Sequence, residues 1–276
     1  MAWGGFTGGI CLNNIVSFHL CLNTYYGHSR VQGDFSKNGF CKKFALFARN
    51  IYIYSMKKSN LDIRMAGLGG QGVVTAAHIL GTAVVAAGKY AVVNPFFGAE
   101  KRLAPTESYV RISAEKIYDR GEVMYPNIIM VFAPQVITVG KSHTLPFYAG
   151  LREGGMILVN SAEPIISEKD RAAIDNLGVK VAYVPATKLA VDFTGTDLSM
   201  NMTMLGALCG MDDTLVDLNA VMTAVDERFS GKTKIVASGT SAALDDAIKS
   251  KFEKMGAMIE KNRTAINKAY EYAKNC

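Results

Sequence analysis

The chain has 276 residues, 49% of them hydrophobic, and a formal net charge of +6. This suffices to bury the core of one large α/β domain, and no stretch approaches the roughly 20 uninterrupted apolar residues of a membrane helix, so we expect no membrane association. All the excess charge lies in residues 1–60, which hold seven basic residues and one acid, whereas residues 61–276 hold 23 of each. The globular part therefore lacks the positive surface of a nucleic-acid-binding protein.

The first 60 residues differ from the rest of the chain in composition and in hydrophobic pattern. They contain three of the five cysteines, many Phe and Tyr, and no helical or strand period. Three interpretations are open: residues that precede a true start at Met56, a basic organellar targeting sequence, or an added docking segment. We predict an N-terminal extension over residues 1–60, either a non-native start or disordered, and one α/β domain over residues 61–274.

A glycine-rich turn is the most informative motif. It reads Gly67-Leu-Gly-Gly-Gln-Gly72, after a predicted strand over residues 61–66 and before a predicted helix over residues 73–88. Glycine permits positive φ angles and lets a ligand approach the backbone, while the first turn of a helix offers unpaired N–H groups and a positive dipole end. The motif predicts a phosphate-binding loop. The alternative is that its glycines only allow the helix to pack closely on the strand.

The second predicted strand argues against a dinucleotide ligand. In NAD-binding proteins an Asp or Glu ends this strand, about 20 residues after the glycines, and binds the ribose hydroxyls. Here the strand over residues 89–93 ends in Asn94. The glycine turn also lacks the Gly-Lys-Ser/Thr of a nucleotide-hydrolysing loop.

Asn94 opens a polar segment that ends at Pro105 and contains Lys101 and Arg102. The second strand should reach the same edge of the sheet as the glycine turn, and ligands of open α/β sheets bind along that edge. Arg102 offers a planar fork to a phosphate or carboxylate, with Lys101 as a point charge. The alternative is a solvated loop, or one that bridges to a neighbouring subunit.

Further along the chain, strands and helices alternate as in a Rossmann-like α/β fold with a mostly parallel sheet and covering helices. From Ala186 onward the pattern is helical, which gives a helical C-terminal third. The apolar stripe of the last helix packs in the core or, at its distal end, forms a subunit interface. The predicted strands are residues 108–112, 128–132, 156–160 and 179–184, and the predicted helices are residues 142–151, 167–177, 188–193, 199–209, 214–229 and 241–274.

The sequence contains no convincing machinery for catalysis. There is no Cys-x-x-Cys pair and no cluster of residues at metal-ligand spacing, so we predict no catalytic and no metal-binding residue in this chain. Cys209 lies in an apolar run, where we expect a small buried hydrophobic residue. Unbridged cysteines favour a cytoplasmic location.

The chain resembles the gamma subunit of 2-oxoacid:ferredoxin oxidoreductases, most closely the pyruvate and 2-oxoisovalerate members. Four segments occur in the family's order: Gly67-Leu-Gly-Gly-Gln-Gly72, Phe97-Gly-Ala-Glu-Lys-Arg-Leu-Ala-Pro105, Val110-Arg-Ile-Ser113 and Asn201-Met-Thr-Met-Leu-Gly-Ala207. The resemblance covers roughly residues 60–274. The family typically has Arg-Gly where this chain has Arg102-Leu103, and loss of that glycine is expected to alter the local backbone.

The resemblance implies a noncatalytic subunit of an enzyme that cleaves a 2-oxoacid, pyruvate first, with coenzyme A (CoA) to give an acyl-CoA, CO₂ and reduced ferredoxin. In such enzymes thiamine diphosphate with Mg binds between the alpha and beta subunits, and [4Fe-4S] clusters lie in the beta and delta subunits. The gamma subunit is associated with assembly and CoA binding, which the resemblance assigns here to Gly67, Gly69, Gly70, Gln71, Gly72 and Arg102. The partners implied are the alpha, beta and delta subunits, and ferredoxin through the complex. Two alternatives stay open: a self-sufficient NAD- or FAD-binding Rossmann oxidoreductase, and a pure scaffold.

Overall fold

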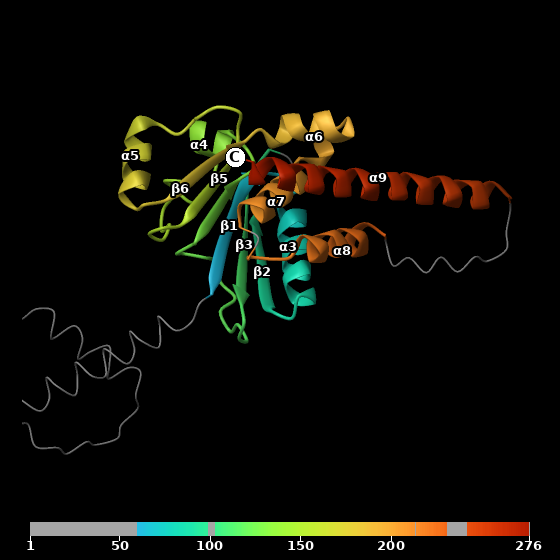
Figure 1. Cartoon of the computed structure of the whole chain (residues 1–276), viewed down its shortest axis with the longest axis horizontal. Helices are drawn as coiled ribbons and strands as arrows, with labels where there is room; N and C mark the ends of the chain where they lie inside the picture. The colour runs from blue at the N-terminus through green and yellow to red at the C-terminus, as the bar shows by residue number, and fades with distance from the viewer. Residues whose placement is uncertain (1–59, 99–102, 213, 231–241, 276) are drawn as a thin grey trace, which may run out of the picture. The chain divides into compact units, whose positions relative to one another are not determined.

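A six-stranded sheet forms the centre of the domain (Figure 1). The computed structural model describes residues 60–98, 103–212, 214–230 and 242–275, with only the backbone for residues 242–252. The strand order is β2-β3-β1-β4-β5-β6, and β3 alone runs antiparallel to its neighbours. The predicted α/β fold with a mostly parallel sheet is therefore confirmed. The strands are β1 (Leu61–Leu68), β2 (Tyr90–Phe97), β3 (Pro105–Ser113), β4 (Ile128–Val131), β5 (Met156–Asn160) and β6 (Lys180–Val184).

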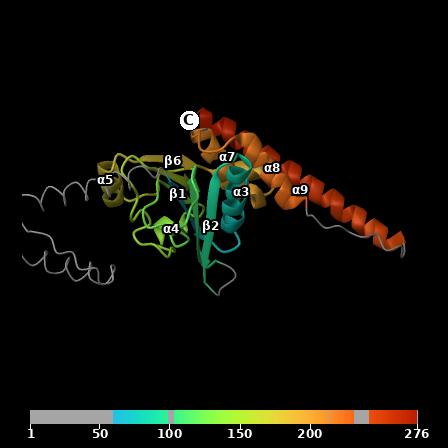
Figure 2. The same cartoon turned by 90° about the horizontal axis from the view of Figure 1, so that it is seen from below.

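Helices cover one face of the sheet more completely than the other. Alternate residues of β1, such as Ile63 and Met65, pack with α3, α7, α8 and α9, and Ala66 and Leu68 pack with α4 and α5 on the opposite face. Figure 2 shows α3, α7, α8 and α9 gathered on one side. The helices of the described residues are α3 (Val73–Ala86), α4 (Gln135–Thr138), α5 (Glu168–Asn176), α6 (Ala186–Thr194), α7 (Met200–Met211), α8 (Leu218–Phe229) and α9 (Ala242–Lys274), with a 3₁₀ turn η1 (Asp197–Ser199).

The long helix α9 confirms the predicted helical C-terminal third. Its buried residues recur every three or four positions from Asn262 to Ala273, and this half packs against α7. The N-terminal end of α9 projects beyond the other helices in both views (Figures 1 and 2). Its cover by another subunit stays a prediction. None of the helices in the described ranges combines the length and hydropathy that a membrane crossing requires.

The helix predicted over residues 142–151 is wrong. This segment is irregular because its backbone groups form hydrogen bonds with buried side chains of the sheet instead of with each other. The Thr144 N–H donates to Glu107 Oε1 at 2.8 Å, and the carbonyls of Phe147 and Ala149 accept from Arg64. Pro146 also lacks the N–H that a helix would use. The sequence pattern carries no sign of these long-range contacts.

Other elements also differ from prediction, mostly in their boundaries. The second strand continues to Phe97, α8 begins at Leu218 rather than at residue 214, and the short helix α4 was not predicted. The predicted extension over residues 1–60 falls outside the described residues except for Asn60, so the extension stays a prediction.

Candidate functional site

The glycine turn connects β1 to α3 as the sequence predicts. Gln71 closes it: its backbone N–H donates to the Leu68 carbonyl at 3.2 Å, and its side-chain Oε1 accepts the Leu68 N–H at 2.9 Å. A glutamine at this position therefore fixes the shape of the turn. Its contacts in the described residues are internal to the turn.

Two glycines of the turn are required by their surroundings. A Cβ added at Gly67 would lie 2.7 Å from Val73 Cγ2, so α3 could not approach β1 as closely. Gly72 precedes α3 with a φ of 73°, and a Cβ there would overlap the side chain of Asn201. Asn201 Nδ2 donates to the Gly72 carbonyl at 3.2 Å, so α7 supports the turn from the side. Close packing, the alternative interpretation of the glycines, thus applies to these two positions.

The first turn of α3 offers unpaired donors to a cavity. Ala76 is the first residue with a helical bond, to the Gly72 carbonyl at 2.9 Å, and the N–H groups of Val73, Val74 and Thr75 have no acceptor among the described residues. These three residues line a cavity of about 670 Å³ with Gly69, Gly70 and Gly72. Among the described residues, neither the first turn of α3 nor the lining of the cavity carries an acid. Unpaired N–H groups, the helix dipole and the absence of negative charge make the cavity receptive to an anion.

The hairpin of β2 and β3 forms the opposite wall of this cavity. Phe97, Gly98 and Thr106 line it. The Gly69 N–H donates to the Ala104 carbonyl at 2.8 Å, and the Leu103 N–H donates to the Gly69 carbonyl at 3.2 Å. The turn and this hairpin therefore meet at one edge of the sheet, as the sequence predicts.

Arg102 is the one predicted site residue that lies outside the described residues, together with its neighbour Lys101. The next residue, Leu103, has a φ of 57°. The site contains further residues to which the sequence interpretation assigned no role, among them Thr75, Phe97 and Asn201. A signal was present for the last two, since both belong to the family motifs.

Asn94 was misplaced by the sequence interpretation. It lies within β2, three residues before the end of the strand, and its Nδ2 donates to the Arg120 carbonyl at 3.1 Å. It takes no part in lining the cavity at the glycine turn. The argument against a dinucleotide now rests on topology: the antiparallel strand β3 occupies the position beside β1 where a dinucleotide-binding fold places its second parallel strand.

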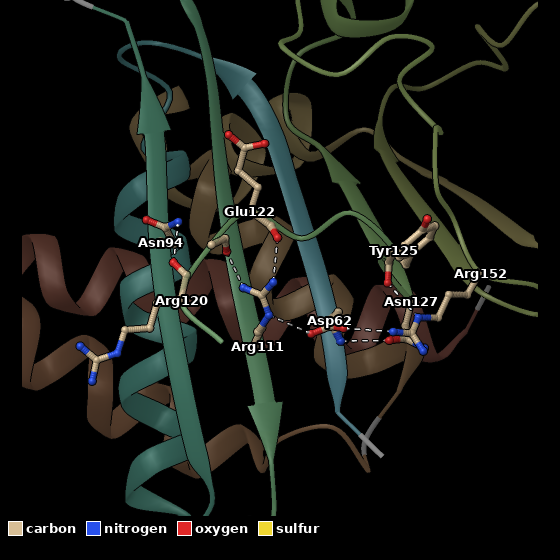
Figure 3. Close-up of polar contacts among 9 residues, drawn as sticks. Asp62, Asn94, Arg111, Arg120, Glu122, Tyr125, Asn127 and Arg152 are labelled. Atoms are coloured by element: carbon tan, nitrogen blue, oxygen red, sulfur yellow. Dashed lines mark hydrogen bonds and ion pairs between the residues drawn. The ribbon is translucent and has the colours of Figure 1, made fainter. Parts of the chain in front are cut away.

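Charged residues at the opposite edge of the sheet hold loops in place (Figure 3). Asp62 lies 3.7 Å from Arg111 Nε and 3.3 Å from Arg152 Nη2, and Arg111 donates to the carbonyls of Gly121 and Glu122. Burial raises the pKa of Asp62, although the two arginines lower it in part. Each guanidinium is committed to loop carbonyls or to Asp62, so this cluster anchors structure.

Glu107 is a second buried charge on the same face of the sheet. It is fully buried, and it accepts hydrogen bonds from Tyr109 at 2.7 Å, from Ser142 at 2.6 Å and from both N–H and hydroxyl of Thr144. Burial alone would raise the pKa of Glu107, but these four donors lower it below its usual value. The carboxylate thus pins the 142–144 segment onto β3.

Cys209 is buried in α7, and burial raises the pKa of its thiol to about 12. The thiolate that a nucleophile or a metal ligand requires is therefore disfavoured, which confirms a packing role. Among the described residues, no group of three or more His, Cys, Asp or Glu side chains is arranged to hold a metal ion.

Comparison with known proteins identifies the family of this chain. Residues 62–243 match the family model for pyruvate ferredoxin/flavodoxin oxidoreductase. The common gamma subunit of the pyruvate/ketoisovalerate oxidoreductases of Thermococcus litoralis is 34% identical over 172 residues, which are 62% of this chain and 88% of that protein. Pyruvate synthase subunit PorC of Methanothermobacter marburgensis is 35% identical over 172 residues, with the same shares of 62% and 88%.

Two solved structures share the fold. Subunit PORC of the Thermotoga maritima pyruvate oxidoreductase has a TM-score of 0.55 and 24% identity, over 78% of this chain and 97% of that one. The 2-oxoglutarate:ferredoxin oxidoreductase of Magnetococcus marinus, solved with 2-oxoglutarate, CoA and succinyl-CoA bound, has a TM-score of 0.54 and 22% identity, over 80% of this chain and 32% of that one. On the family match and the sequence relatives together, this chain belongs to the pyruvate ferredoxin/flavodoxin oxidoreductase family and is a gamma-type subunit of a multi-subunit 2-oxoacid oxidoreductase.

Proposed function

We propose that this subunit contributes to CoA binding at the cavity beside the glycine turn, in addition to its part in assembly. The observation that carries the proposal is the first turn of α3, whose three N–H groups without acceptors open onto a cavity in which no acid lines the wall, as far as the described residues go. The diphosphate of CoA is the kind of anion that such a helix N-terminus binds. The Magnetococcus marinus oxidoreductase, which shares the fold, was solved with CoA bound.

The proposed roles of the predicted site residues differ from one another. Gly69, Gly70 and Gly72 line the cavity and let the diphosphate approach the backbone, whereas Gly67 and Gln71 keep the turn in shape. Arg102 would add a guanidinium from the 99–102 segment, which lies outside the described residues; its role rests on the sequence alone.

The reaction itself is assigned to partner chains. We propose that the complex oxidises a 2-oxoacid, pyruvate first, with CoA to give acyl-CoA and CO₂, and that the two electrons pass to ferredoxin. Thiamine diphosphate, Mg and the [4Fe-4S] clusters would be held by alpha, beta and delta subunits. The described residues contain no group of three or more His, Cys, Asp or Glu side chains that could hold a metal ion, in keeping with this assignment to the partner chains.

The test places a negative charge in the proposed anion site. Gly70 has a φ of 97°, and a Cβ added there would have no other atom within 4 Å, so a small side chain meets no neighbour among the described residues. In the purified complex, Gly70→Asp is expected to weaken CoA binding by about tenfold or more, because a carboxylate repels the diphosphate. Isothermal titration calorimetry with CoA measures the effect.

Gly70→Asn is the matched control. It has the same shape without the charge, and Asn tolerates positive φ better than most residues, so it should weaken CoA binding far less than Gly70→Asp. Equal CoA affinity in wild type and both variants would reject the ligand role and leave the chain as a scaffold. Tight binding of NAD(H) or FAD to the chain, seen by fluorescence, would favour the self-sufficient oxidoreductase instead.

A further inference from the structure

A second cavity adjoins the glycine turn on the side of the C-terminal helices. It has a volume of about 480 Å³ and lies between the first turn of α3, η1, α7, the end of α8 and α9. Thr75 lines both this α9 cavity and the cavity at the glycine turn. The two cavities therefore meet at the first turn of α3.

The α9 cavity contains the side-chain amide of Asn262. Asn262 is 5% exposed, and its Oδ1 accepts a hydrogen bond from Ser199 Oγ at 3.0 Å. The residue lines the cavity, and an amide nitrogen is a donor only, so Asn262 can offer a hydrogen bond to an acceptor bound there.

Positive charge accompanies this donor. Lys254 and Lys261 both line the α9 cavity, and their spacing of seven residues places them two turns apart on one face of α9. Neither ammonium group has an ion-pair partner in the described part of the chain, and no Asp or Glu of that part lines the cavity. The cavity is thus rich in donors, positively charged and free of acids.

The other walls of the α9 cavity are apolar. Leu198, Phe229 and Met258 line it, and Leu198 is 83% exposed. An inorganic anion alone would leave these side chains in water. The combination fits an anionic group attached to an apolar or aromatic body.

We propose that the α9 cavity binds the adenosine 3′-phosphate end of CoA, with the phosphate at Lys254, Lys261 and Asn262 and the adenosine against Phe229 and Met258. This rests on the proposed function, in which the diphosphate of the same molecule lies at the glycine turn. CoA carries its negative charge at two separate positions, the diphosphate and the 3′-phosphate. Two anion-receptive cavities that share Thr75 match that arrangement, and lysine is a suitable point charge for a terminal phosphate.

The test compares CoA with 3′-dephospho-CoA, which lacks only the 3′-phosphate. In the wild-type complex, CoA should bind about tenfold more tightly than 3′-dephospho-CoA, and the double variant Lys254→Gln/Lys261→Gln should remove this difference by weakening CoA alone. Isothermal titration calorimetry gives both dissociation constants. Lys254→Arg/Lys261→Arg keeps the charges and should restore most of the preference. Lys268→Gln, on the same helix but outside the cavity, should leave both ligands unchanged.

The outcomes separate this inference from the proposed function. If the double Gln variant weakens neither ligand, or weakens both equally, while Gly70→Asp still weakens both, the 3′-phosphate site is overturned and the glycine turn keeps its role. If neither the glycine-turn variant nor the lysine variants change CoA binding, both proposals fail. Native mass spectrometry shows whether the variant complexes are intact. If the double variant does not assemble, the single variants Lys254→Gln and Lys261→Gln replace it. Each should reduce the preference for CoA over 3′-dephospho-CoA, by less than the double variant.

Discussion

At the scale of single residues, Leu103 is the unusual one. It is the one non-glycine residue with positive φ in the described part of the chain, at 57°, and its side chain is 66% exposed. The left-handed conformation costs an L-residue about 1–2 kcal/mol, and the exposed side chain recovers little of this by burial. The family resemblance predicts Gly at this position. The φ of Leu103 is one that glycine favours, so the leucine carries the strain.

Leu103→Gly is therefore expected to stabilise the chain relative to Leu103→Ala. The alanine variant keeps the Cβ and the strained φ, whereas the glycine variant removes the strain, and the free energy of unfolding should differ by about 1 kcal/mol in favour of glycine. Urea denaturation of the two variants measures it. A more stable alanine variant would contradict the strain.

The buried carboxylate of Glu107 makes the stability of the fold depend on pH. Its pKa is lowered because four donors stabilise the carboxylate, so its ionised form stabilises the fold above its usual pKa of 4.5, and this contribution is lost as the pH falls through the lowered value. Arg64, also buried, adds a favourable charge on the same face of the sheet.

Glu107→Gln should lower the free energy of unfolding at pH 7 by about 2–3 kcal/mol. The amide NH₂ of glutamine would face hydrogen-bond donors where the carboxylate accepted from them, so some of these hydrogen bonds would be lost. The difference from wild type should shrink as the pH is lowered below 4.5. Denaturation at several pH values measures both effects. The exposed Glu163→Gln serves as control, and a difference independent of pH would show that the ionised form contributes nothing.

The residues of the site could be predicted only in part. The glycines and their placement between β1 and α3 follow from the sequence, since glycine restricts where a turn and a close contact can lie. Asn201 belongs to a family motif, but its hydrogen bond to the Gly72 carbonyl could not be predicted, because 129 residues separate the two. Arg102 stays a prediction.

At the scale of elements, the most extensive helix contact in the described part of the chain lies between α7 and α9. A Cβ added at Gly206 would lie 2.8 Å from the Ile266 Cα, so the glycine lets the two backbones approach. This contact holds the C-terminal half of α9, and α9 supplies Lys254, Lys261 and Asn262 to the α9 cavity.

Gly206→Ala is expected to destabilise the chain by about 1–3 kcal/mol, because a methyl group there forces α7 and α9 apart. Gly256→Ala is the matched control: it also lies in a helix, with open space around it, and should stabilise by about 0.5–1 kcal/mol through helix propensity. Thermal unfolding followed by circular dichroism compares the two. A loss of stability in both variants would mean that the α7–α9 contact is not the cause.

Elements were predictable where their own sequence decides them. The parallel strands β4 and β5 each contain a continuous run of four apolar residues, and both lie within one residue of their predicted bounds. Ser167 caps α5 by accepting the Asp170 N–H, as its position before the helix suggests. The helix prediction for residues 142–151 was wrong because charged residues of distant strands determine the backbone conformation of this segment.

At the scale of the whole domain, the sequence indicates a mostly parallel sheet with helices but leaves the strand order open. Pairing of β3 between β2 and β1 is a long-range choice that hydrophobic periodicity does not encode. That insertion decides the site, because it brings the start of β3, rather than a parallel strand, beside the glycine turn. The cavity at the glycine turn follows from it, since Phe97, Gly98 and Thr106 form one of its walls.

The link between Gly69 and the 103–104 segment is made by main-chain groups alone. Its geometry therefore does not depend on which side chains stand there, and substitutions such as leucine for glycine at residue 103 can accumulate without moving the turn. The frame around the turn is thus set by the path of the main chain, and the side chains of this segment can vary independently of it.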